Sequence, residues 1–271
     1  MFWQDRQEAR PSPSVAVCYI PCSICRNFRM RHTLSDELIE SLRQGPLLAG
    51  LSPELVRELL PQLEYRHWPR RRIVMTPRET VEEFCLLIQG RVKITRQNPD
   101  TGRELTLFLL GPGDGFNVVS LLDGRPHEVT AETLDDVEAL CGPVTLWQSW
   151  LDQHPSLLRA VRRYVDRQLR QLSELASDLA LHDTMTRLAH LILRNFEDSR
   201  QDPRRDLLRG LSHEELAHLI GTVRVVVNRL LREMREEGIV DCEGGELHVR
   251  NLQKLLAVAE GHLSRQNGQK R

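Results

Sequence analysis

The sequence predicts an α+β fold whose parts follow one another along the chain: short strands, one long helix, then two short helices and a β-hairpin. Short β-rich runs between turn-forming residues occupy about 67 to 143. Apolar residues then recur every three or four positions from 158 to 179. A serine-capped helix, a glycine turn and a second amphipathic helix follow between 212 and 235.

The composition is that of a soluble globular chain. Its 271 residues carry a formal net charge of -1, and 40% are hydrophobic while 28% are charged. This length suits two modest domains, each with its own core. No apolar run of roughly eighteen residues could span a membrane, and residues 1 to 17 lack the apolar stretch of a signal peptide. We therefore expect a cytoplasmic protein without membrane contact, where persistent disulfides are rare and clustered cysteines favour metal or redox chemistry.

The strand-rich part is predicted to form a β-sandwich or barrel. Two serine-capped helices precede it, in the segments TLSDELIESL and LSPELVRELLPQL. Strand-like runs such as EFCLLIQGRVKITRQ and RELTLFLL then alternate with the turn sequences QNPDTG, GPGDG and LDGRP. Many short strands with regular turns are typical of closed antiparallel folds.

The long helix carries an apolar seam whose positions alternate steps of three and four. The seam consists of Leu158, Val161, Val165, Gln168, Leu172, Leu175 and Leu179. Over three heptads this pattern is typical of a two-helix coiled coil, so we expect a homodimer. Only Gln168 is polar in the seam, and it is uncharged, so the dimer should hold without a ligand. The alternative is a helix whose stripe faces the core of its own chain.

The segment LSHEELAHLIGTVRVVVNRLLREMREEGIV predicts a helix–turn–helix. Ser212 and Glu215 fit a capping box, Gly221 sits where a tight turn needs positive φ, and Thr222 can cap the second helix. Arginine and asparagine in the first turns of a helix suit the DNA major groove, where Arg bridges guanine, Asn bridges adenine and Val touches a thymine methyl group. The predicted DNA-contacting residues are Thr222, Arg224, Val225, Asn228, Arg229 and Arg232. The alternative is a solvated basic face, but the following hairpin, IVDCEGGELHV, completes a winged motif.

From about residue 33 to 250 the chain resembles the CRP/FNR superfamily of transcription regulators. The order of strands, long helix, TRLAHLIL and a winged motif ending REEGIV carries the resemblance. It implies a cyclic-nucleotide-binding-like β-roll at 33–150, a dimerisation helix at 151–185 and a C-terminal winged helix-turn-helix DNA-binding domain at 186–255. A flexible segment with cysteines at 1–32 and a helix end and tail at 256–271 complete the chain. The resemblance also implies a homodimer, a palindromic double-stranded operator with half-sites about one DNA turn apart, RNA polymerase as a partner, and no enzymatic activity.

The recognition helix departs from the usual pattern of that superfamily at Val225. The two arginines of the common R-E-T-V-x-R motif match Arg224 and Arg229, but Val225 replaces the acidic residue that usually reads a cytosine. A valine side chain cannot accept a hydrogen bond from a base. The cyanobacterial nitrogen-control branch also has valine there, so the site is expected to resemble its GTA-type half-site.

The roll also lacks the residues by which the cyclic-AMP branch holds its nucleotide. The position of the ribose-binding glutamate falls on Val118 or Asn117, and Pro126 stands after Arg125 where that branch has a serine. Proline offers a phosphate neither hydroxyl nor N–H. Cyclic AMP is therefore not the expected ligand; a small acid such as 2-oxoglutarate, or haem, is the alternative effector.

The segment CYIPCSIC places Cys18, Cys22 and Cys25 within eight residues of a chain that has six cysteines. FNR-type members hold an oxygen-sensitive [4Fe-4S] cluster with N-terminal cysteines and one distant cysteine, and Cys141 matches the distant one. The resemblance thus implies that Cys18, Cys22, Cys25 and Cys141 ligate such a cluster and sense oxygen, nitric oxide or redox state. The match is incomplete, because Arg31 stands where that branch commonly has a further cysteine.

Other roles for the cysteines stay open. They could be surface thiols, bind zinc with Cys141 or His32, or form a redox disulfide. Cys85 is expected to be a buried core thiol. The C-x3-C-x2-C spacing also occurs in radical-SAM enzymes, but no alternating βα pattern follows, which argues against an enzyme.

Overall fold

The computed structural model describes residues 35 to 243 and 246 to 261. The segment with Cys18, Cys22 and Cys25, the predicted leader and the predicted tail lie outside these ranges. No helix of the described residues is long and apolar enough to cross a membrane.

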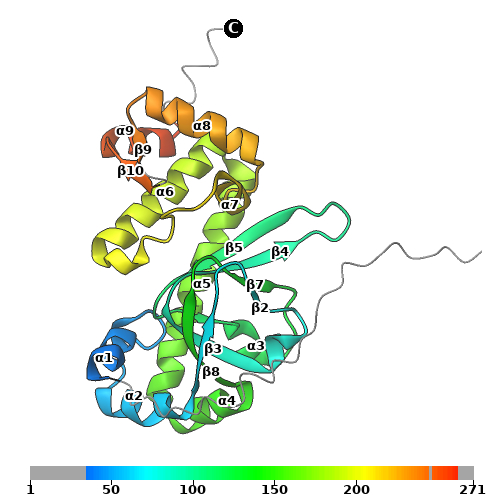
Figure 1. Cartoon of the computed structure of the whole chain (residues 1–271), viewed down its shortest axis with the longest axis vertical. Helices are drawn as coiled ribbons and strands as arrows, with labels where there is room; N and C mark the ends of the chain where they lie inside the picture. The colour runs from blue at the N-terminus through cyan, green and yellow to red at the C-terminus, as the bar shows by residue number, and fades with distance from the viewer. Residues whose placement is uncertain (1–34, 244–245, 262–271) are drawn as a thin grey trace, which may run out of the picture. The chain divides into compact units, whose positions relative to one another are not determined.

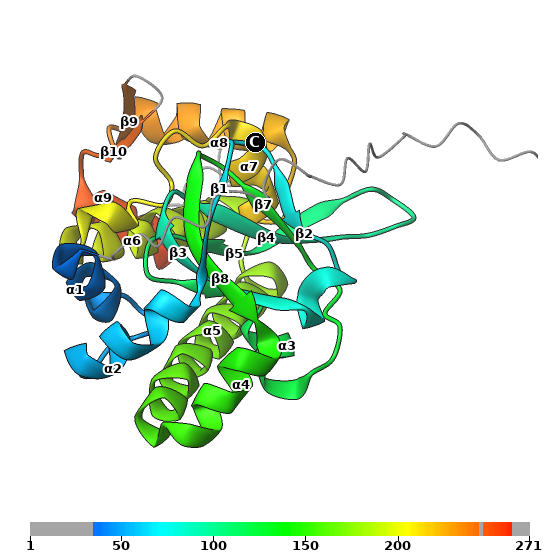
Figure 2. The same ribbon diagram turned by 60° about the horizontal axis from the view of Figure 1, so that its bottom comes forward.

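Two four-stranded antiparallel sheets form the β-roll (Figures 1 and 2). The first contains, in spatial order, β1 (Glu64–Trp68), β8 (Val137–Pro143), β3 (Glu83–Gln89) and β6 (Gly115–Phe116). The second contains β2 (Ile73–Met75), β7 (Thr130–Thr133), β4 (Val92–Gln97) and β5 (Glu104–Leu110). Side chains from both sheets share one buried cluster that includes Leu87, Ile94 and Phe116. The predicted roll is confirmed.

Helices cover the roll and continue out of it. They are α1 (Asp36–Gln44), α2 (Pro53–Leu59), η2 (Leu60–Gln62), η3 (Glu79–Val81), α3 (Val118–Asp123), α4 (Val144–Gln153) and the long α5 (Pro155–Leu181). Ser35 and Ser52 cap α1 and α2 as predicted, each accepting a backbone N–H. Trp147 of α4 packs edge-on against Phe84 of β3, and Tyr164 of α5 joins the same buried cluster. The start of α5 is therefore part of the core of the roll.

The C-terminal part has a core of its own. Its elements are α6 (Thr184–Gln201), η4 (Pro203–Arg205), α7 (His213–Leu219), α8 (Arg224–Glu236), β9 (Val240–Glu243), β10 (Glu246–Val249) and α9 (Leu252–Ala259). Leu188, Val227 and Met234 are fully buried in this core. The strands β9 and β10 pair antiparallel and form the wing. The helix-turn-helix and its wing are thus confirmed.

The turn between α7 and α8 follows the sequence prediction with one exception. Ser212 and Glu215 make the capping box at the start of α7, and Gly221 has a φ of +64°. A β-carbon at Gly221 would lie 2.5 Å from Leu179 Cδ2, so close packing against α5 also requires glycine here. The exception is Thr222: α8 begins at Arg224 with Val223 as its N-cap residue and without a side-chain cap.

Candidate functional site

The outer face of α8 is the candidate DNA-contacting surface. The helix buries Val227, Leu230, Leu231 and Met234 against the C-terminal core. This turns the opposite face to solvent, where Val225 is 76% exposed. The exposed residues of this face are Arg224, Val225, Asn228, Arg229 and Arg232. Five of the six predicted contact residues therefore share one surface, while Thr222 is half-buried in the turn and donates its backbone N–H to Ala217 O at 2.9 Å.

The cationic side chains on this face are available for a polyanion. Within the described part of the chain, Arg224 and Arg229 form no ion pair, and Arg232 makes only a loose one with Glu236 at 3.8 Å. Unpaired guanidinium groups can bind phosphate or the O6 and N7 atoms of guanine without first breaking a protein contact.

Asn228 has a partner that the sequence did not indicate. Its side-chain oxygen contacts His213 Nδ1 at the start of α7. This contact joins the two helices of the motif, and Asn228 must release or share it to bridge an adenine. His213 and Asn228 are 15 residues apart, and only the packing angle of α7 on α8 brings them together.

The long helix buries one member of the predicted seam in the roll. Val161 is fully buried in the core of the roll, Val165 packs against that core, and Gln168 donates to Tyr164 Oη at 3.0 Å. The large exposed apolar side chains of α5 are Leu158 (47%), Leu169 (65%) and, at the end of the helix, Leu181 (77%), and the small Ala176 is also exposed. Leu158, Leu169 and Ala176 share one a/d stripe with the exposed Arg162 and with the half-buried Val165, Leu172 and Leu179. Within this stripe, Val165 packs on the roll and Leu179 lies against Gly221. Val161 is the predicted member that the structure contradicts, because its side chain is buried in the core of the roll. The other positions of the predicted seam stay a prediction.

The predicted ligand Cys141 is joined to Cys85 in a disulfide. The two residues face each other on the neighbouring strands β8 and β3, and their side chains are 1% and 2% exposed. The sulfur of Cys141 is thus bonded and buried here, and as placed in this structure it is not available to ligate a cluster or zinc. Cys85 lies in the core as predicted, but not as a free thiol. The cysteines at 18, 22 and 25 lie outside the described residues.

The segment that would hold a cyclic nucleotide is occupied by contacts within the roll. Val118 begins α3 and is 3% exposed, so it offers neither charge nor hydrogen bond to a ribose. Asn117 adopts a left-handed conformation and donates its amide to the backbone oxygens of Thr80 and Glu83. Arg125 and Pro126 are exposed. Burial lowers the pKa of the half-buried His127 beside them, which favours the neutral imidazole.

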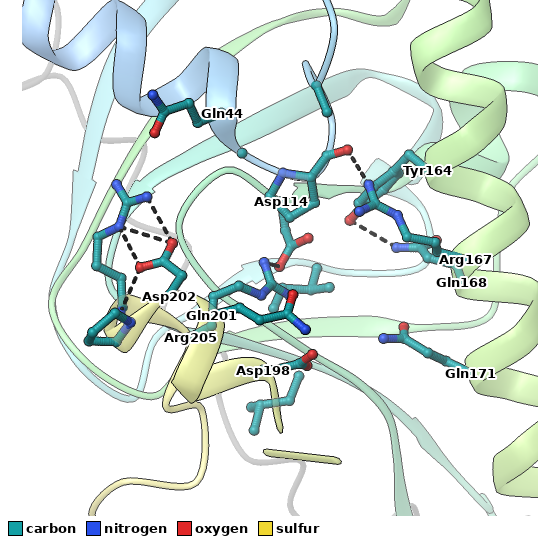
Figure 3. A pocket seen from close by; sticks show the side chains of 17 residues that line it. Gln44, Asp114, Tyr164, Arg167, Gln168, Gln171, Asp198, Gln201, Asp202 and Arg205 are labelled. Carbon is teal, nitrogen blue, oxygen red and sulfur yellow. Dashed lines mark hydrogen bonds and ion pairs between the residues drawn. The ribbon is translucent and has the colours of Figure 1, made fainter. Parts of the chain in front are cut away.

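A pocket of about 520 Å³ opens where the roll, α5 and the C-terminal part meet (Figure 3). Its deepest charge is Asp114, in the turn between β5 and β6, which is only 4% exposed. Arg205 of η4 reaches Asp114 Oδ2 at 3.2 Å, and the N–H of Gly111 donates to the same oxygen at 3.0 Å. Burial outweighs these partners and raises the pKa of the Asp114 carboxyl.

The α5 side of the pocket is lined by polar side chains. Tyr164 donates its hydroxyl to Gly115 O at 2.8 Å, and burial raises its pKa well above the usual range, so it stays a neutral phenol. Arg167 donates to Pro46 O across the opening. Gln171 and Gln201 line the same space and make no hydrogen bond within the described part of the chain. The wall thus offers donors and acceptors to a small polar molecule.

No single segment of the sequence indicated this pocket. Asp114 and Arg205 are 91 residues apart, and each stands in a run that reads as an ordinary turn. The GPGDG sequence signalled the turn around Asp114, but not the arginine that meets it.

Two family models and several relatives match the chain. The family model for a cyclic nucleotide-binding domain matches residues 65–154, and the model for a Crp-like helix-turn-helix domain matches residues 186–258. The global nitrogen regulator of Synechocystis sp. is 30% identical over 217 residues, which cover 78% of this chain and 95% of that protein. The CRP-like cAMP-activated global transcriptional regulator of Mycobacterium tuberculosis is 28% identical over 218 residues, or 80% of this chain and 97% of that protein. Among solved structures, a CooA mutant from Carboxydothermus hydrogenoformans has the same fold, with a TM-score of 0.65 at 22% identity over 83% of this chain and 97% of that one.

Proposed function

Because the chain belongs to the CRP/FNR superfamily of DNA-binding transcription regulators, which are not enzymes, we propose that it acts as a homodimer on a palindromic operator. In this proposal the protein works in the cytoplasm and contacts RNA polymerase at the operator. Its DNA binding responds to oxygen, nitric oxide or redox state. The proposal that the protein binds DNA rests on the exposed face of α8, where Arg224 and Arg229 form no ion pair within the described residues and lie beside Val225. Two such helices in a two-fold dimer fit half-sites about one DNA turn apart.

Arg229→Ala tests the assigned face. The DNA is a duplex with two GTA-type half-sites in inverted orientation, one helical turn apart, and fluorescence anisotropy gives the Kd. Loss of one base-contacting arginine is expected to weaken specific binding by about 1–3 kcal/mol. Arg57→Ala is the matched control, since Arg57 lies on α2 and pairs with Asp36 at the surface. Equal affinities for the two variants would show that this face does not contact the operator.

Val225→Glu tests the base preference. Valine can touch a thymine methyl group, whereas a carboxylate accepts from the amino group of cytosine. We expect the variant to lose affinity for the GTA-type duplex and gain it for one with cytosine at the contacted position. Selection from a random duplex library measures this shift, and an unchanged preference would remove Val225 from the readout.

The seam of α5 can be tested with two neighbouring residues. Leu169 is 65% exposed in the single chain and would be buried in a coiled coil, whereas Gln168 is hydrogen-bonded to Tyr164. Leu169→Glu places an unpaired charge in the dimer interface and is expected to give monomers in light scattering at micromolar concentration. Gln168→Glu should stay dimeric. Dimers of Leu169→Glu would refute this seam.

For the sensing part, we propose that Cys18, Cys22 and Cys25 bind three irons of a [4Fe-4S] cluster. Three closely spaced thiolates supply the soft ligands that iron–sulfur clusters need. Since Cys141 is committed to Cys85 in the structure, the fourth iron takes a ligand outside this buried pair. The N-terminal cysteines thus supply three of the four ligands in this proposal.

Iron and sulfide content after anaerobic purification tests the cluster. The full chain should be brown, with about four irons and four sulfides. Cys22→Ser should abolish the colour, while Cys141→Ser, the matched control, should keep it. A colourless wild-type chain, or one with stoichiometric zinc instead, would end the cluster proposal, and loss of iron in Cys141→Ser would return that residue to the ligand set.

A second candidate is a small-molecule effector, which the pocket at Asp114 favours. One relative is named as a cAMP-activated regulator, so cyclic AMP is one ligand to titrate. The others are 2-oxoglutarate and haem, the alternative effectors that the sequence suggested. Arg167 and Gln171 on α5 face the Arg205 side of the pocket, so a ligand there would contact both α5 and the DNA-binding part. Saturable binding by calorimetry that Gln171→Leu weakens would support this candidate, and no binding of the three compounds would leave the redox proposal alone.

A further inference from the structure

Three potential metal ligands meet at the junction of α5 and α6, where only His182 and Asp183 separate the two helices. They are Asp178 in the last turn of α5, His182 just after it, and His190 on α6. One ligand atom from each lies within 4.8 Å of the others. The rings of His182 and His190 stand nearly perpendicular, with their centres 5.1 Å apart.

The contacts of His190 require a cation beside its Nδ1 atom. Its Nε2 lies 3.1 Å from the backbone oxygen of Ala259, which only accepts, so Nε2 carries a hydrogen. Its Nδ1 lies 2.7 Å from Asp178 Oδ1. In a neutral imidazole this would oppose two lone pairs, so a second proton lies between the two atoms at this distance. A metal ion, which needs about 2 Å to each ligand atom, would replace that proton once the two side chains move slightly apart. Metal-binding histidines commonly donate their other N–H to a backbone carbonyl, which is the arrangement at Ala259.

Asp178 is held so that one oxygen remains directed at this point. The side chain is 5% exposed, and its Oδ2 accepts from Arg194 at 3.0 and 3.1 Å. Oδ1 is left to His190. A carboxylate fixed by an arginine on one oxygen can use the other oxygen as a metal ligand, as outer-shell hydrogen bonds do in known sites.

His182 distinguishes a metal site from a simple ion pair. A protonated His190 would satisfy Asp178 without any third residue. The His182 side chain is exposed and makes no hydrogen bond within the described part of the chain, yet its ring meets that of His190. It therefore offers a free nitrogen where a third ligand is needed.

We propose that Asp178, His182 and His190 bind a divalent metal ion of the zinc class. Two imidazoles and one carboxylate suit Zn²⁺ or Co²⁺, and three protein ligands leave the fourth tetrahedral position to water. The ion would join the last turn of α5 to α6, which leads into the DNA-binding part. The site involves none of the cysteines and is independent of the proposed redox sensing.

Cobalt is the probe, because its absorption spectrum reports ligand type. The full chain with Cys18, Cys22, Cys25 and the free Cys242 replaced by serine removes these competing thiolates. We expect one equivalent of Co²⁺ per chain, a spectrum without sulfur-to-cobalt charge transfer, and displacement by Zn²⁺. His182→Ala and His190→Ala should each weaken binding by at least about tenfold. His67→Ala, an exposed histidine on β1, should not.

His182→Cys tests whether weaker cobalt binding in the alanine variants comes from loss of a ligand or from loss of folding. His182 is exposed, so the variant should fold, keep the cobalt and acquire a thiolate charge-transfer band. Absence of saturable cobalt binding in the parent chain, or binding unchanged in both alanine variants, would overturn the site. A cobalt complex of His182→Cys without that band would also refute it.

Discussion

Two buried carboxylates connect the roll and α5 to the DNA-binding part, and each meets an arginine of that part. Asp114 lies in a turn of the roll, is 4% exposed and pairs with Arg205 at 3.2 Å. Asp178 lies on α5, is 5% exposed and pairs with Arg194 at 3.0 Å. Asp178 has His190 as a second partner at 2.7 Å, whereas the further hydrogen bond of Asp114 within the described residues comes from the N–H of Gly111.

This difference shows which of the two contacts with the DNA-binding part is more easily disrupted. At the pocket, Arg205 is the one side chain that pairs directly with the buried carboxylate among the described residues, while Arg167 contributes only its nearby charge. The direct contact therefore depends on a single side chain. At the junction of α5 and α6, the carboxylate keeps a partner if one is removed. A buried charge left without any partner is far more costly than one that retains a partner. The pocket is thus the contact that a ligand could most readily replace.

The largest expected effect is that of Arg205→Ala. It leaves Asp114 buried with one backbone donor and the nearby charge of Arg167, and it should lower the free energy of unfolding by about 3 kcal/mol. Arg204→Ala, one residue away, is the matched control: Arg204 is 46% exposed and pairs with Asp202 at the surface, so its loss should cost less than about 1 kcal/mol. Urea unfolding measures both. Equal losses would show that burial of Asp114 does not set the cost.

Arg194→Ala should have a smaller effect, although it removes the same kind of group. Asp178 keeps His190, so we expect a loss of about 1.5 kcal/mol in metal-free protein. Arg200→Ala on the same helix, where the arginine lies over the ring of Phe196, is the control and should cost less than about 1 kcal/mol. A loss for Arg194→Ala as large as that for Arg205→Ala would contradict the role given to His190.

Elements with local signals could be predicted from sequence, and those that depend on distant partners could not. The capping box of Ser212 and Glu215 and the glycine turn at Gly221 lie within ten residues, and each has its own steric or hydrogen-bonding cause. The apolar pattern of α5 placed Val161 in the predicted seam, and only the roll packed against this helix shows that Val161 points inward. The Cys85–Cys141 bond spans 56 residues and follows from strand pairing that no local pattern reveals.

Stability measured over a pH series compares Asp114 with Asp135, a third carboxylate where the roll meets the DNA-binding part. Arg91 hydrogen-bonds Asp135 at 2.6 Å, also donates to Leu207 O of the DNA-binding part at 2.8 Å, and lowers the pKa of Asp135. A lowered pKa contributes stability above the unfolded value that is lost as the pH falls. The raised pKa of Asp114 acts in the opposite sense: its contribution is complete at low pH and is lost as the pH rises through the folded value.

Asparagine variants allow both pH dependences of stability to be measured, since asparagine does not titrate. Between about pH 7 and about pH 4, the stability of the wild type relative to Asp135→Asn should decrease on acidification, because the wild type loses an ion pair that the variant never had. Relative to Asp114→Asn, the stability of the wild type should increase on acidification. Protonation neutralises the buried Asp114 carboxylate, whose charge Arg205 compensates only in part. If both differences decrease, Arg205 compensates Asp114 fully. The pocket contact would then be an ordinary ion pair, no weaker than the one at the junction of α5 and α6.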